Sequence, residues 1–188
     1  MKRHIYIVIS QTGTLLSRII KLVTKSEYNH ASISLVPDLD VMYSFGRKHP
    51  YNPFWGGFVK ESPRWGTFKR FSKTRIQVLD LTVTEEQYQQ IQSRINIISA
   101  NRHHYHYNYL GLYLAAFQIP YHHKRCFYCS EFVNHLLVRS EIQGAKNAQA
   151  IVQPMHFLSL PEAKPVYTGR LIDYSRFAAV YFAKKAVC

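Results

Sequence analysis

Runs of apolar and alternating residues mark two early strands. Residues 5–9 (IYIVI) are apolar and mostly β-branched, which predicts a buried strand. Residues 30–35 (HASISL) alternate between a small or apolar side chain and a polar one, which predicts a second strand. His30, Ser32 and Ser34 would then share the face opposite the apolar residues. The segment after the turn at 37–40 is apolar again, so we expect it to return as the partner strand of a hairpin.

The rest of the chain alternates between helical and extended patterns. A capping-box pattern, Thr84 to Gln87, opens one of the helices. The Gly-, Pro- and aromatic-rich segment 46–73 predicts a long ordered excursion, which we interpret as the wall or lid of a binding cleft. Helices are predicted at about 15–25, 84–100, 107–118 and 129–143, and strands at 75–81 and 178–182. These elements predict one α+β domain that spans residues 1–188.

Composition narrows the class of protein. The 188 residues suffice for one packed domain, and the three cysteines form no disulfide framework. The apolar run near residue 5 is shorter than the core of a signal peptide, and no apolar stretch approaches the ~20 residues of a membrane span. We therefore expect a soluble, cytoplasmic protein. A net charge of +13 favours anionic partners, but the basic residues are scattered and lie in no nucleic-acid-binding motif.

Residues 127–137 (FYCSEFVNHLL) carry the clearest chemical signal. Their apolar residues recur at the spacing of one helix face, and Cys129 stands just before that periodic run. A thiol at a helix N-terminus meets unpaired backbone N–H groups and the positive end of the helix dipole, and both favour the nucleophilic thiolate. Cys129 is therefore a candidate nucleophile. The alternative is a buried cysteine that only packs.

A cysteine nucleophile needs a base, and His30, at the head of its strand, is the candidate. The alternative for His30 is a surface histidine of a strand. Cys126 and Cys129, together with the histidines of 103–106 and 122–123, also allow a zinc site or a redox dithiol. Against zinc, the chain has no second Cys-x-x-Cys pair. Against a redox site, the pair comes late in the chain, so we expect neither metal nor cofactor.

Two segments resemble the signatures of a known group of enzymes. Residues 28–34 (YNHASIS) and 127–133 (FYCSEFV) resemble those of the circularly permuted papain-like cysteine hydrolases. This is the YiiX-like branch of the NlpC-type superfamily, related to the lecithin–retinol acyltransferases. Residues 10–14 and 42–47 also resemble bacterial members. The resemblance covers about residues 5 to 175, and the histidine precedes the cysteine, as in the permuted enzymes.

The resemblance implies a catalytic role for each signature. Cys129 would be the nucleophile and His30 the base, with a third polar group on the next strand that orients the imidazole. Segment 41–45 offers no carboxylate, amide or imidazole there, so Ser44 is the first choice by position, followed by Tyr43 and then Glu61. The implied fold is a permuted papain-like α+β fold with an antiparallel sheet packed against the Cys129 helix.

The expected activity is hydrolysis or acyl transfer at an amide or ester bond of a peptide, cell-wall amide or lipid. Backbone N–H groups near Cys129 would hold the oxyanion. The charge favours an anionic or amphiphilic substrate. The rival hypothesis is a non-catalytic binding module that uses a decayed papain-like fold and its basic surface to hold an anionic polymer or lipid.

Overall fold

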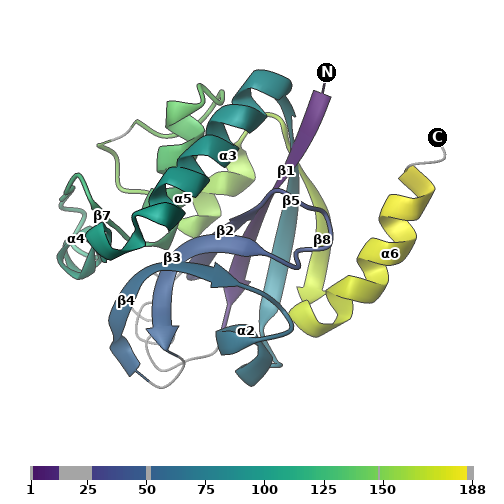
Figure 1. Cartoon of the computed structure of the whole chain (residues 1–188), viewed down its shortest axis with the longest axis horizontal. Helices are drawn as coiled ribbons and strands as arrows, with labels where there is room; N and C mark the ends of the chain where they lie inside the picture. Colours follow the sequence, from purple (N-terminus) through teal and green to yellow (C-terminus); the bar gives the residue numbers. More distant parts are fainter. Residues whose placement is uncertain (1, 13–26, 50–51, 148, 186–188) are drawn as a thin grey trace.

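The computed structural model describes residues 2–12, 27–49, 52–147 and 149–185. Six strands form an antiparallel sheet in the order β4-β3-β2-β1-β5-β8 (Figure 1). They are β1 (Lys2–Gln11), β2 (His30–Ser34), β3 (Met42–His49), β4 (Asn52–Glu61), β5 (Arg75–Thr84) and β8 (Ala163–Arg170). Two short strands, β6 (His106–Tyr107) and β7 (Cys126–Phe127), form a separate parallel pair. The architecture is therefore α+β, with an antiparallel sheet.

Helices cover both faces of this sheet. They are α2 (Gly66–Arg70), α3 (Glu85–Ala100), α4 (Tyr109–Ala115), α5 (Cys129–Arg139) and α6 (Tyr174–Lys185), with 3-10 turns at Arg102–His104, Pro154–Ser159 and Leu171–Asp173. Helices α3 and α5 pack with the sheet in the larger core, whereas α2 and α6 belong to the smaller core on the other face (Figure 1). Alternate residues of β1 enter the two cores, Ile7 the larger one and Val8 the smaller one.

Four phenylalanine rings join the start of α5 to the sheet. Phe132 of α5 lies 5.1 Å from Phe45 of β3 and 5.8 Å from Phe58 of β4, measured between ring centroids. Phe127 packs on the same Phe45 ring at 5.3 Å. These rings lie at distances typical of favourable aromatic pairs, so they fix α5 against β3 and β4.

Truncation of this cluster should cost much of the stability. We expect Phe132→Ala to lower the free energy of unfolding by about 3–5 kcal/mol, because it removes a fully buried ring and leaves a cavity. Ile97→Ala on the exposed side of α3 is the matched control, expected to change it by less than about 0.5 kcal/mol. Urea denaturation measures both. Equal effects of the two substitutions would contradict the assignment of this cluster to the core.

The buried carboxylate of Asp80 connects α6 to the sheet, on the face opposite α3 and α5. Asp80 of β5 accepts from His4 Nδ1 at 2.6 Å through one oxygen and from Lys185 Nζ at 2.9 Å through the other. The aspartate is thus paired with a residue of β1 and with the last turn of α6. A buried charge needs such partners, because an unpaired one is costly to remove from water.

Several sequence predictions are confirmed, and others are wrong. The strands at 5–9, 30–35, 41–45 and 75–81 and the capping box of the helix after Thr84 are confirmed. Segment 46–73 was predicted as a long ordered excursion with short extended pieces, but it contains the ten-residue strand β4 and helix α2. Glycines and prolines hid this strand: Gly56, for example, lies where a Cβ would come within 2.8 Å of Tyr107.

The C-terminal prediction is also wrong. Residues 178–182 are part of α6, and the strand of this region is β8 instead. The apolar run was ambiguous, but Tyr174 and Ala178 have helical spacing and are buried against the sheet. The helices predicted at 107–118 and 129–143 are present but shorter. The helix predicted at about 15–25 lies outside the described residues.

Candidate active site

Cys129 is the first residue of α5. The first helical hydrogen bond runs from Phe132 N–H to the carbonyl of Tyr128 at 3.0 Å, so the N–H groups of the preceding turn have no helical acceptor. One of them, on Ser130, hydrogen-bonds to Cys129, and so does the backbone N–H of Ala31 in β2. The helix start and the neighbouring strand thus both direct donors at one buried sulfur.

His30 stands between that cysteine and a carboxylate. It begins β2, which brings its imidazole to the start of α5, and its side chain hydrogen-bonds to Cys129. On the other side of the ring, Nε2 lies 2.9 Å and 3.1 Å from the two carboxylate oxygens of Glu61. The second ring nitrogen, Nδ1, is therefore the one left for the sulfur. Cys129, His30 and Glu61 form a connected series from three different elements.

Glu61 is held in this position by a neighbour of His30. The hydroxyl of Ser32 donates to Oε2 of Glu61 at 2.6 Å. Ser32 and His30 are two residues apart in β2, so they share the side of the strand that the alternation predicted. Gly46 of β3 lies beside this pair, because a Cβ at its position would be in van der Waals contact with His30 Cε1 at 3.4 Å and with Glu61 Oε1 at 3.5 Å. The role of Ser32 could have been found from its spacing to His30.

In this series, each charged side chain stabilises the charged form of its neighbour. Burial alone would lower the pKa of His30, but the charge of Glu61, together with hydrogen bonds to Cys129 and Glu61, raises it to about 10. Burial alone would raise the pKa of Cys129, but the hydrogen bond and charge of His30 and the N–H groups of Ala31 and Ser130 lower it. The arrangement therefore favours the thiolate–imidazolium form of this pair over its neutral form.

The third polar group is not the one preferred from the sequence. Ser44 was the first choice, but its buried hydroxyl donates to the carbonyl of Ala31 at 2.7 Å. Tyr43, the second choice, stacks on Phe58 of the larger core. Glu61, the third choice, is the group at His30. Because β4 was not recognised as a strand, nothing in the sequence indicated that residue 61 would reach the sheet beside residue 30.

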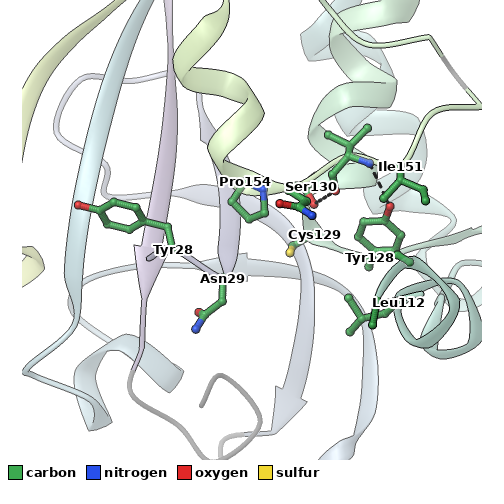
Figure 2. Close-up of a pocket in the computed structure, with 12 residues that line it drawn as sticks. Tyr28, Asn29, Leu112, Tyr128, Cys129, Ser130, Ile151 and Pro154 are labelled. Atoms are coloured by element: carbon green, nitrogen blue, oxygen red, sulfur yellow. Dashed lines mark hydrogen bonds between the residues drawn. The ribbon is translucent and has the colours of Figure 1, made fainter. Parts of the chain in front are cut away.

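A mostly apolar pocket opens beside the sulfur. Figure 2 shows Cys129 at its wall, with Tyr28 and Asn29 to one side and Leu112 and Tyr128 to the other. Ser130 and Tyr128 are anchored by hydrogen bonds to the backbone of Val152, so this part of the wall is fixed. The other lining residues are Ala115, Ala116, Ile151, Gln153 and Pro154. The pocket can accept an apolar group next to the candidate nucleophile.

Cys126 and His122 interact with Glu131 and not with this series. Cys126 is half-buried in β7, and burial, followed by the charge of Glu131, raises the pKa of its thiol. His122 Nδ1 lies 2.6 Å from a carboxylate oxygen of Glu131. Among the described residues, no three His, Cys, Asp or Glu side chains gather as a metal site would require.

Comparisons of the chain with protein-family models, with curated proteins and with solved structures found no match. Within the described part of the chain, every helix is too short or too polar to cross a bilayer.

Proposed function

We propose that the protein is a cysteine hydrolase or acyltransferase that acts on amide or ester bonds. The observation that carries the proposal is the placement of the His30 imidazole between the Cys129 thiol and the Glu61 carboxylate. A nucleophile, a base and a group that orients the base are what covalent acyl transfer requires. In this proposal Cys129 and His30 are catalytic residues, and Glu61 and Ser32 are positioning residues.

The reaction would proceed in two steps. The Cys129 thiolate attacks the substrate carbonyl carbon to form a C–S bond, and the tetrahedral oxyanion accepts hydrogen bonds from nearby backbone N–H groups such as that of Ser130. The C–N or C–O bond then breaks, and the His30 imidazolium gives its proton to the leaving amine or alcohol. His30 next takes a proton from water, or from an acceptor alcohol or amine, which attacks the thioester and releases Cys129.

The permuted papain-like fold is part of the same proposal. Its support is the order of the parts along the chain: the histidine strand comes first, the carboxylate strand follows two strands away in the sheet, and the cysteine helix comes last. The apolar pocket at Cys129 and the net charge of +13 favour an anionic or amphiphilic substrate. The free thiols of Cys126 and Cys129 suit the expected cytoplasmic location.

The rival proposal is a non-catalytic module that binds an anionic polymer. Its support is the basic charge, together with the lack of a suitable third group among residues 41–45. Glu61 supplies that group from another strand, and a carboxylate paired with His30 serves proton transfer rather than polymer binding. The contacts at His30 therefore favour the enzyme.

An activated ester separates the two proposals. We expect p-nitrophenyl acetate to acetylate the protein at Cys129 in a rapid burst, because the lowered pKa of this thiol favours the nucleophilic thiolate. Intact-mass spectrometry followed by peptide mapping measures the adduct. Cys129→Ala should slow acetylation at least about 100-fold, whereas Cys126→Ala, the matched control, should leave it unchanged. Acetylation that persists in Cys129→Ala would favour the binding module.

A further inference from the structure

Helix α4 and the turn after it expose an unusual number of large apolar side chains. Leu110 and Tyr113 are three residues apart and share one face of α4, and Phe117 lies in the turn that follows the helix. The rings of Tyr113 and Phe117 pack together, with centroids 5.2 Å apart. The exposed fractions are 51% for Leu110, 64% for Tyr113, 61% for Phe117, 50% for Ile119 and 39% for Tyr121. We call these five residues the α4 patch.

The backbone holds the patch in a defined shape. Asn108 caps α4 by accepting from Gly111 N–H at 2.9 Å, and its side chain also donates to Glu131 of α5 at 3.2 Å. At the other end, Gln118 has a positive φ of 61°, and Ile119 N–H donates to the carbonyl of Leu114 at 3.0 Å. These contacts end the helix and turn the chain, so the apolar side chains are exposed on a fixed element.

The charged side chains of the segment that carries the patch have one sign. Residues 101–125 contain three Lys or Arg, five His and no Asp or Glu. The acidic residue nearest in sequence, Glu131, is buried and paired with His122. Arg102, Lys124 and Arg125 are exposed at the two ends of this segment. A cluster of aromatic and aliphatic side chains flanked by cations alone is complementary to a surface that is apolar within and anionic at its rim.

We propose that the α4 patch docks the protein on the surface of an anionic lipid membrane. The exposed aromatic rings and Leu110 enter the headgroup region, and the flanking cations contact lipid phosphates. The element lies on the bilayer and does not span it, because α4 has only seven residues. The opposite side of α4 carries Leu112 and Ala115, which line the pocket at Cys129, so the membrane would lie against the helix that walls this pocket.

Vesicle sedimentation of the full chain tests the proposal. We expect the protein to bind vesicles of phosphatidylcholine with phosphatidylglycerol, and to bind pure phosphatidylcholine vesicles much more weakly. Leu110→Ser with Phe117→Ser should lower the partition coefficient at least about tenfold, because two large apolar groups no longer enter the interface. Lys124→Glu with Arg125→Glu should lower binding to the anionic vesicles by about tenfold or more.

A matched control replaces two exposed apolar residues outside the α4 patch. Ile172 and Val180 are as exposed as the patch residues and lie at or in α6, on the far side of the molecule from α4 (Figure 1). Ile172→Ser with Val180→Ser should therefore leave vesicle binding unchanged. Equal loss in this control and in the patch variant would overturn the proposal, because binding would then not depend on the α4 patch.

Hydrogen exchange of the unmodified protein provides a second measurement that needs no substitution. Anionic vesicles should slow amide exchange in residues 109–121 more than elsewhere in the described chain. An unchanged exchange pattern would overturn the proposal. A second outcome would also overturn it: the wild type forms dimers without vesicles, does not bind vesicles, and loses dimerisation in the patch variant. The patch would then join two copies of the chain. None of these readouts uses acyl transfer, so the proposal can fail while the proposed activity stands.

Discussion

Cys129 is expected to react with iodoacetamide at pH 6 at least about tenfold faster than Cys126. His30 and the backbone N–H groups of Ala31 and Ser130 lower the pKa of Cys129, whereas burial raises the pKa of Cys126, so a larger fraction of Cys129 is thiolate at pH 6. A thiol with a pKa above the usual ~8.5 holds less than about one part in 300 as thiolate at pH 6. The weaker intrinsic nucleophilicity of a low-pKa thiolate offsets part of that difference. Peptide mapping by mass spectrometry measures each cysteine separately.

The pH dependence gives the control within the same experiment. A lowered pKa means that Cys129 loses its proton at a lower pH, and a raised pKa of about 10 means that His30 keeps its proton well above neutrality. The labelling rate of Cys129 should therefore reach its plateau at a lower pH than an ordinary thiol does, while that of Cys126 should reach it at a higher pH. Parallel profiles for the two cysteines would contradict the thiolate–imidazolium pair.

Glu61→Gln should lower the pH 6 labelling rate of Cys129 at least about tenfold. Without the carboxylate charge, burial dominates at His30 and lowers the pKa of the imidazole, so the ring loses the proton that stabilises the thiolate. The amide keeps the size of the side chain and can still hydrogen-bond, so the fold should be retained. Hydrolysis of p-nitrophenyl acetate should fall with the labelling rate, and both are measured on the same preparation.

Ser44→Ala is the matched control for the choice of third group. Ser44 is as buried as the residues around His30, but its hydroxyl serves the carbonyl of Ala31. Its loss should lower the free energy of unfolding by about 1 kcal/mol and change the Cys129 labelling rate by less than about twofold. A loss of reactivity in Ser44→Ala with none in Glu61→Gln would restore the order of preference that the sequence suggested.

The parts of the site that were predictable carry strong local patterns. The alternation of residues 30–35 predicted β2 and the side on which His30 and Ser32 lie, because strand periodicity is a property of consecutive residues. The apolar spacing after Cys129 likewise predicted α5 and the position of the thiol at its start. In both cases the information lies within about ten residues of sequence.

The position of Glu61 depends on sheet register, which no local pattern contains. Glu61 pairs with Met42 across β3 and β4, and Tyr43 pairs with Ile33 across β3 and β2. These two registers together place the carboxylate beside His30, and a one-residue slip in either would send it to the other face. The glycines and prolines of 46–73 also concealed β4 itself, so the element that carries Glu61 was missing from the prediction.

The strand order also affects how the chain can fold during synthesis. Strand β1 is inner in the sheet, yet one of its two partners, β5, comes much later in the chain, since Gln11 pairs with Arg75 and Lys2 with Thr84. Such distant pairing slows folding, because the intervening chain must close a long loop before any contact stabilises it. Until β5 leaves the ribosome, one edge of β1 is open to wrong partners, so chaperone binding at this stage would protect the nascent chain.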